Sequence, residues 1–130
     1  MGSHGSRFRL TVEGKISANP FQFAINVKEG SNTLFHMNPR WSEGRTVFNI
    51  CHSSRGWGQP EYAFFSSLTP KANFRVEIVY QGGRFEVVVN DEPAVYFQEK
   101  LAMARTEKEI TVEKVDQKDL ALRSVQLVEF

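Results

Sequence analysis

The sequence between residues 36 and 57 reads HMNPRWSEGRTVFNICHSSRGW, and polar side chains alternate along its first part. His36, Asn38 and Arg40 lie two residues apart. Successive side chains of a β-strand point to opposite faces, so we expect these three to project from one face of a sheet. Met37 would then turn to the other face, toward a hydrophobic core.

A second strand is predicted from Val47 to Cys51, with Asn49 on the same face as Val47. A turn rich in Ser and Gly follows and leads to Trp57 and Gly58. Together the two segments supply an imidazole, two amides, a guanidinium and an indole. Amide and guanidinium groups can bridge neighbouring hydroxyls, and an indole offers a large flat apolar surface. This combination indicates a binding site for a polyhydroxylated ring, that is, for a sugar.

Short alternating stretches continue along the rest of the chain. The residues at 74–80 and 85–89 alternate on either side of the turn Gln81-Gly82-Gly83, which predicts a β-hairpin. The segment 120–130 changes the parity of its apolar residues, as a β-bulge would. Only 100–109 favours a helix, of one or two turns. About ten short strands predict an all-β fold, either an antiparallel sandwich or a barrel.

The composition is typical of one folded domain. The chain has 130 residues, of which 41% are hydrophobic, enough to build a packed core. The net charge is +1, without a basic block, so we expect no nucleic-acid partner. No apolar run is long enough for a membrane span or a signal peptide, so we expect no membrane insertion. We interpret residues 1–6 (MGSHGS) as an expression-tag remnant and residues 7–130 as a single domain.

The order of these motifs resembles the galectins, the β-galactoside-binding lectins, whose signature is H-x-N-P-R, then V-x-N, then W-G-x-E-x-R. HMNPR at 36–40 and VFN at 47–49 match the first two motifs, and Trp57-Gly58 matches the start of the third. The resemblance extends over residues 7–130. It implies a two-sheet antiparallel β-sandwich of jelly-roll (galectin/concanavalin-like) topology, which binds β-galactosides on one sheet face without metal or cofactor.

The resemblance also implies a role for each matching residue. His36, Asn38 and Arg40 would hold the axial O4 of galactose. Asn49 would hold O6, and Trp57 would stack under the galactose ring. The axial O4 distinguishes galactose from glucose, and a site built to hydrogen-bond it rejects a sugar that leaves those polar groups unpaired.

The third motif departs from the family pattern after Gly58. In the family a glutamate and a second arginine follow, and the glutamate bridges the sugar next to galactose and the site arginines; here those places hold Pro60 and Tyr62. Glu61 comes one residue late, either replacing the glutamate through a longer loop before Trp57 or remaining a solvated carboxylate. No nearby arginine replaces the second one. We therefore expect the galactose contacts to persist and the preference for the second sugar to be weakened or altered.

Two other functions stay open at this level: a galectin-fold protein that has lost lactose binding and acts as a protein–protein interaction module, and a lectin for a different glycan. Catalysis is not expected, because glycoside hydrolysis needs two carboxylates about 5–10 Å apart around the bond. Only Glu61 lies near the predicted site, with Glu43 a weak second. Cys51, His52 and His36 match no zinc-binding spacing, so no metal is expected.

The resemblance also sets expectations for partners and location. The expected partners are galactose-containing glycans or glycoproteins. A homodimer and a longer two-domain chain both remain open. The single cysteine, Cys51, excludes an intramolecular disulfide, which fits either a reducing cytosolic environment or export without reliance on disulfides. Family habit implies a cytoplasmic location, with non-classical secretion to the extracellular space.

Overall fold

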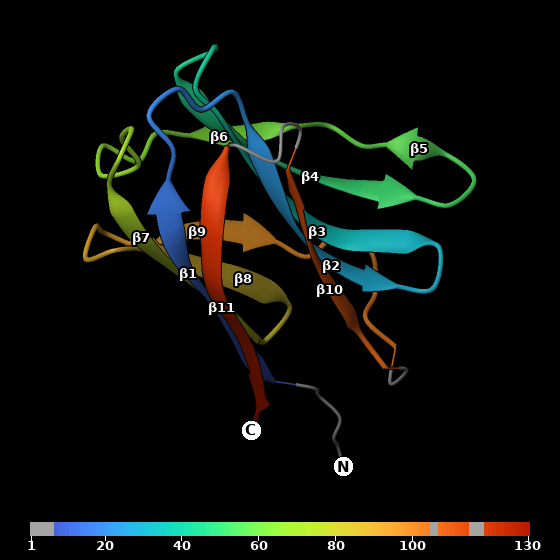
Figure 1. The fold of residues 1–130 in the computed structure, drawn as a ribbon. Coiled ribbons are helices and arrows are strands. Elements are labelled where there is room, and N and C mark those ends of the chain that lie inside the picture. The colour runs from blue at the N-terminus through green and yellow to red at the C-terminus, as the bar shows by residue number, and fades with distance from the viewer. Residues whose placement is uncertain (1–6, 105–106, 115–118) are drawn as a thin grey trace.

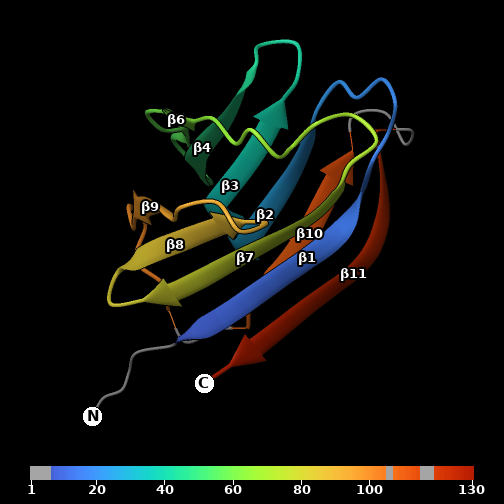
Figure 2. The same ribbon diagram turned by 90° about the vertical axis from the view of Figure 1, so that its left-hand side faces the viewer.

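The computed structural model describes residues 7–104, 107–114 and 119–130. These residues form two antiparallel β-sheets packed face to face, so the prediction of an all-β sandwich is confirmed (Figure 1; Figure 2).

The first sheet has the strand order β11-β1-β7-β8-β9. Its strands are β1 (Phe8–Ile16), β7 (Asn73–Gln81), β8 (Arg84–Val89), β9 (Val95–Gln98) and β11 (Leu120–Glu129). The second sheet has the order β10-β2-β3-β4-β5, and β6 also pairs with β4. Its strands are β2 (Phe23–Glu29), β3 (Asn32–Arg40), β4 (Arg45–His52), β5 (Gly56–Trp57), β6 (Glu61–Ala63) and β10 (Glu109–Lys114).

Phenylalanine rings fill much of the space between the sheets. Phe35 of β3 stacks on Phe85 of β8 with ring centroids 4.6 Å apart, and Phe48 of β4 stacks on Phe97 of β9 at 6.0 Å. All four side chains are at most 1% exposed. Burying an apolar side chain of this kind stabilises the fold by about 1.5–3 kcal/mol. The core therefore fixes which residues of β3 and β4 face inward and which polar residues face outward.

Two local features predicted from the sequence are confirmed. β7 and β8 pair as a hairpin around the turn at 81–83. The register between β1 and β11 shifts between Glu13 and Gly14, where β11 passes from Ser124 to Leu122. This extra residue in β11 is the bulge that the change of apolar parity indicated.

The helix predicted at 100–109 is not formed by its described residues. Instead, the side chain of Glu29, the last residue of β2, contacts two described residues of this segment. A carboxylate oxygen of Glu29 accepts a hydrogen bond from the Ala104 amide at 3.0 Å, and the other lies 2.9 Å from Lys108 Nζ. These long-range contacts outweigh a weak local preference for helix. Within the described ranges, no helix is long and apolar enough to cross a membrane.

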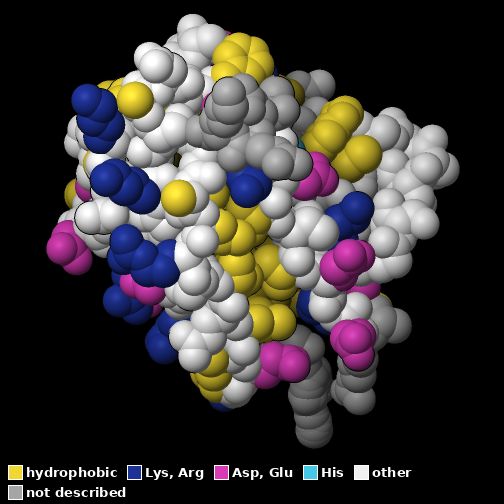
Figure 3. Space-filling model, in the orientation of Figure 1, with side chains coloured by type: hydrophobic (Ala, Val, Ile, Leu, Met, Phe, Trp, Pro, Cys, Tyr) yellow, Lys and Arg dark blue, Asp and Glu magenta, His cyan; other side chains and the backbone are white. Residues whose placement is uncertain are grey.

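The sandwich is open on the side where the edge strands β10 and β11 lie (Figure 1). Hydrophobic side chains form a strip between these two strands on the surface (Figure 3). Val125 and Leu127 of β11 pair with the buried Val12 and Leu10 of β1 and therefore share the core-facing side of the sheet. They are nevertheless 41% and 38% exposed, so the apolar interior reaches the surface at this edge.

Candidate carbohydrate-binding site

The predicted polar residues lie in register on the face of the second sheet that points away from the core. His36 of β3 pairs with Asn49 of β4, and Asn38 pairs with Val47. Directly paired residues project from the same face of a sheet, so the two predicted segments form one surface. This surface contains a cleft of about 190 Å³, lined by His36, Arg40, Val47, Asn49, Trp57, Pro60 and Tyr62.

Pro39 explains how its two polar neighbours are held. The register of β2 and β3 places Phe23 opposite Pro39, which has no N–H to donate across the sheet. Asn38 Nδ2 donates to the Phe23 carbonyl instead, at 2.6 Å. The amide oxygen of Asn38 then accepts a hydrogen bond from Arg40 Nε at 2.7 Å. The N-P-R sequence thus aligns the Arg40 guanidinium along the cleft through Asn38, which the β2 backbone holds in place.

His36 is oriented by residues of two neighbouring strands. Asn26 of β2 donates through Nδ2 to Thr111 Oγ1 of β10 at 3.1 Å, which turns its oxygen toward His36 Nδ1 at 2.6 Å. Because an amide oxygen only accepts, Nδ1 carries the proton and Nε2 remains an acceptor. Burial and the nearby charge of Arg40 lower the pKa of His36 from 6.5 to about 4. The ring is therefore neutral near pH 7.

Asn49 is held by the turn that carries Trp57. Its Nδ2 donates to the Gly58 carbonyl at 3.1 Å, and its oxygen accepts from the Ile50 amide at 2.8 Å. A Cβ atom at Gly58 would lie 3.1 Å from the Ile50 side chain and 3.3 Å from Asn49 Oδ1. Glycine therefore allows the chain to pass close to Asn49. Trp57 itself is 59% exposed. The centroid of its ring lies 4.7 Å from the centroid of the His36 ring.

Several hydrogen-bonding groups of the cleft have no partner among the described residues. They are the Nε2 acceptor of His36, the Nη2 group of Arg40 and the second N–H of Asn49 Nδ2. A sugar hydroxyl both donates and accepts, so one hydroxyl can donate to the imidazole and accept from the guanidinium. Trp57 adds an apolar surface for C–H groups. The cleft can thus hold a hexose ring.

The structure does not bring Glu61 to this cleft. Glu61 of β6 pairs with the core-facing Phe48, so its side chain leaves the sheet on the opposite side from the cleft. Its carboxylate accepts a hydrogen bond from Lys100 Nζ. Tyr62, one residue later, pairs with Val47 and lines the cleft instead.

The structure also shows neighbours of the site that the sequence analysis missed. Asn26 and Thr111 are distant in sequence from His36 and reach it only through the pairing of β10, β2 and β3. No arginine close to Tyr62 in the sequence replaces the second arginine of the motif, but in the structure the Arg45 guanidinium lies 3.8 Å from the centroid of the Tyr62 ring. Strand periodicity placed each residue on a face, but it did not reveal which strands are neighbours.

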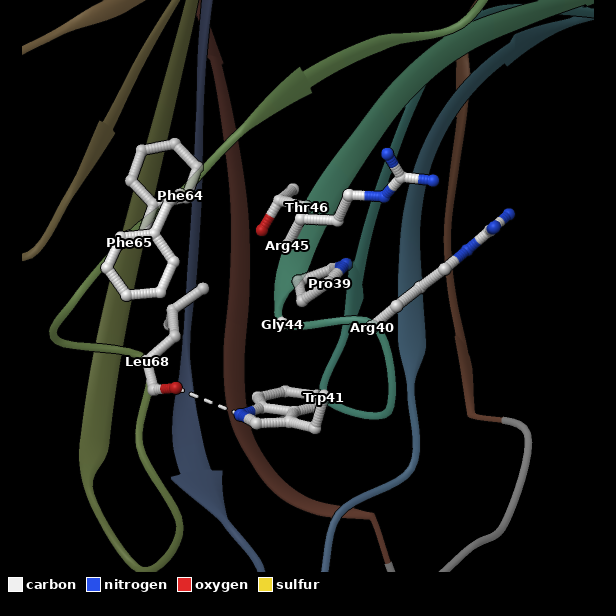
Figure 4. A pocket seen from close by; sticks show the side chains of 9 residues that line it. All are labelled: Pro39, Arg40, Trp41, Gly44, Arg45, Thr46, Phe64, Phe65 and Leu68. Atoms are coloured by element: carbon white, nitrogen blue, oxygen red, sulfur yellow. Dashed lines mark hydrogen bonds between the residues drawn. The ribbon is translucent and has the colours of Figure 1, made fainter.

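A second hollow, of about 60 Å³, lies beside the end of the β3–β4 hairpin (Figure 4). Trp41 lines it, and the Trp41 indole N–H donates to the Leu68 carbonyl at 2.9 Å. The side chains of Arg40 and Arg45 border this hollow but extend away from it, both from the same hairpin (Figure 4). Its lining is mostly apolar, so we assign it to packing and not to sugar binding. No group of three or more His, Cys, Asp or Glu in the described part of the chain could hold a metal ion.

Comparisons with known proteins agree with this fold. The family model described as galactoside-binding lectin matches residues 4–127. Over 93 residues the chain is 31% identical to mouse galectin-2, covering 71% of each protein. Over 97 residues it is 26% identical to rabbit galectin-3, covering 73% of this chain and 40% of galectin-3. The chain therefore spans about two fifths of the length of that relative.

Solved structures show the same fold. A double mutant of Congerin II superposes with a TM-score of 0.80 at 25% identity, covering 93% of this chain and 90% of that one. The Caenorhabditis elegans galectin LEC-6 superposes with a TM-score of 0.77 at 22% identity, covering 93% and 81%. The fold is the β-sandwich of these galectin structures. The chain belongs to the galectin family of galactoside-binding lectins, as its motifs predicted, and like other galectins it is not an enzyme.

Proposed function

We propose that this chain binds β-galactosides in the cleft of the second sheet through His36, Asn38, Arg40, Asn49 and Trp57. The observation that supports this most directly is that two groups lining the cleft have no hydrogen-bond partner among the described residues. One is an acceptor, His36 Nε2, and the other is a donor, the Nη2 group of Arg40. A hydroxyl that points axially from the sugar ring toward the sheet can satisfy both groups at once. An epimer without that hydroxyl would leave both unpaired, which is costly in a partly buried site.

We further propose that binding of the sugar next to galactose is weakened or altered in preference, relative to galectins with the full W-G-x-E-x-R motif. Glu61 is turned toward Lys100, away from the cleft. A lost charge-assisted hydrogen bond is worth about 1.5–3 kcal/mol. That corresponds to about 10- to 100-fold in affinity, at about 1.4 kcal/mol per factor of ten. The proposal therefore excludes Glu61 from the sugar ligands.

An amide and indole NMR titration with lactose tests this function, with sucrose as the control sugar. We expect the Trp57 indole signal to shift with lactose alone. The Trp41 indole, which donates to the Leu68 carbonyl outside the cleft, should not shift and serves as an internal control.

A variant links those shifts to the cleft. Trp57→Ala should lower lactose affinity about tenfold, since aromatic contacts add about 0.5–1.5 kcal/mol beyond the area they bury. Because Trp57 is 59% exposed, the melting temperature should change little. If millimolar lactose shifts no signal of the cleft, the proposal is wrong. That result would favour the alternative, a galectin-fold interaction module that no longer binds lactose.

Galactose-containing glycans and glycoproteins are the partners that this proposal implies. A homodimer is part of it too: one structural neighbour, at 22% identity, is described as a homodimeric agglutinin from chicken liver. The exposed apolar side chains of β11 support the same idea. Sedimentation should then give twice the mass of the 14.9 kDa chain. Cytoplasmic location with non-classical secretion stays a prediction from the family.

A further inference from the structure

The β3–β4 hairpin holds a carboxylate beside the cleft that the family motif does not anticipate at this position. Glu43 accepts hydrogen bonds from Arg40 Nη1 and from Arg45 Nε, each at 3.0 Å. The turn is closed by bonds from the Glu43 amide to the Arg40 carbonyl and from the Gly44 amide to the Trp41 carbonyl, each 3.2 Å. Gly44 adopts a φ of +68°, which glycine takes without strain. One carboxylate thus holds two arginines in fixed positions.

Arg45 is held from a second direction by an aromatic ring of the cleft wall. Tyr62 pairs with Val47, and Arg45 lies two residues from Val47 on the same face of β4. This diagonal placement puts the Arg45 guanidinium 3.8 Å from the centroid of the Tyr62 ring. The terminal Nη groups of Arg45 have no acceptor among the described residues, and 44% of its side chain is exposed. Arg45 does not itself line the cleft, but its planar pair of donors lies beside Tyr62, which forms this rim of the cleft.

The charges around this rim do not balance. Hydrogen bonds from Arg45 and Arg40 lower the pKa of Glu43, so its carboxylate is charged. It offsets only one of the two guanidinium groups. His36 is neutral near pH 7, and the charge of Glu61 is matched by Lys100. The Tyr62 side of the cleft therefore carries an excess of positive charge.

We propose that Arg45, fixed by Glu43 and Tyr62, forms a second subsite that takes an anionic group on the residue attached to galactose. The chemical class is a galactoside whose neighbouring sugar carries a sulfate or a carboxylate. The fork of Nη donors matches two oxygens of such an anion, and a charge-assisted bidentate contact is stronger than a neutral one. This inference rests on the proposed function, because it needs galactose to occupy the cleft.

The test compares three ligands by calorimetry: methyl β-galactoside, N-acetyllactosamine and N-acetyllactosamine with a 6-O-sulfate on its N-acetylglucosamine. We expect the sulfated ligand to bind about 5- to 10-fold more tightly than the unsulfated disaccharide, the range of an exposed charge-assisted contact. The difference should shrink as salt is added, because exposed charges are screened.

Two matched variants locate the effect. Arg45→Gln should reduce the ratio of the two disaccharide affinities to about one. Arg84 provides the control, since its guanidinium also lies over a tyrosine ring, that of Tyr96 at 4.3 Å, but in the other sheet. Arg84→Gln removes the same charge and should keep the ratio of the parent protein. Equal ratios in Arg45→Gln and the parent would overturn the inference.

A third variant tests the role of Glu43 as a positioning residue. Glu43→Gln removes the carboxylate that holds both arginines, so the Arg45 Nε signal should move toward that of a free arginine. The ratio for the sulfated ligand should fall, and Glu43→Asp should restore part of it. A parent protein that binds methyl β-galactoside but shows no preference for sulfate refutes this second subsite alone. A parent that binds none of the three ligands refutes the proposed function itself.

Discussion

Acid should destabilise this protein through His36. Burial and the charge of Arg40 hold the pKa of His36 at about 4 in the folded protein, against an ordinary value of 6.5. As the pH falls below 6.5, His36 binds a proton in the unfolded chain. In the folded protein the same ring stays neutral until about pH 4. The free energy of unfolding therefore decreases through this window as pH falls. The whole effect is about 3 kcal/mol, at about 1.4 kcal/mol per pH unit of difference.

The effect can be measured by urea unfolding at both ends of the window. Carboxylates titrate over the same range, so His36→Gln is needed as a reference. A glutamine can still donate to the Asn26 oxygen but does not titrate. Between neutral pH and pH 4, the parent should lose about 3 kcal/mol more stability than the variant.

The titration of the imidazole provides the refuting result. Carbon- or nitrogen-edited NMR of the His36 ring gives its pKa directly. Galactoside affinity should be constant above pH 6.5 and should fall as pH approaches 4, because protonation removes the Nε2 acceptor. A His36 ring that titrates near 6.5, or an equal pH dependence in parent and variant, would show that the reasoning about its burial is wrong.

Three substitutions test other parts of the site. Gly58→Ala should weaken lactose binding in the NMR titration, because the new Cβ would lie 3.3 Å from Asn49 Oδ1; unchanged affinity would contradict the close approach. Trp41→Phe loses an indole hydrogen bond to a backbone carbonyl and should cost about 1 kcal/mol in urea unfolding. Its lactose affinity should remain that of the parent. Glu61→Gln should also leave calorimetric lactose affinity unchanged, and a tenfold loss would show that this carboxylate reaches the ligand.

Much of the site was predictable because a β-strand has a strict period of two. That period places His36, Asn38 and Arg40 on one face and Met37 in the core, where it is fully buried. The same rule identified the bulge in β11 and the β7–β8 hairpin. These predictions need no knowledge of which strands are neighbours, because each depends on residues close together in the chain.

The role of Glu61 shows where periodicity alone is insufficient. A shift of one residue moves a side chain to the opposite face of a sheet. The pairing of Phe48 with Glu61 is set by the core, and it sends Glu61 away from the cleft and Tyr62 toward it. Because the loop before Trp57 is longer than in the family, the sequence alone does not determine whether Glu61 or Tyr62 faces the cleft.

By itself, then, the sequence determined the class of fold, the galectin motifs and the face on which the residues proposed to bind galactose lie. Only the tertiary structure decided that Asn26 orients His36 and that Arg45 lies over Tyr62. The physical reason is that local alternation is set by backbone geometry. Contacts between distant strands are set by register, and register depends on how the two sheets pack around the shared core.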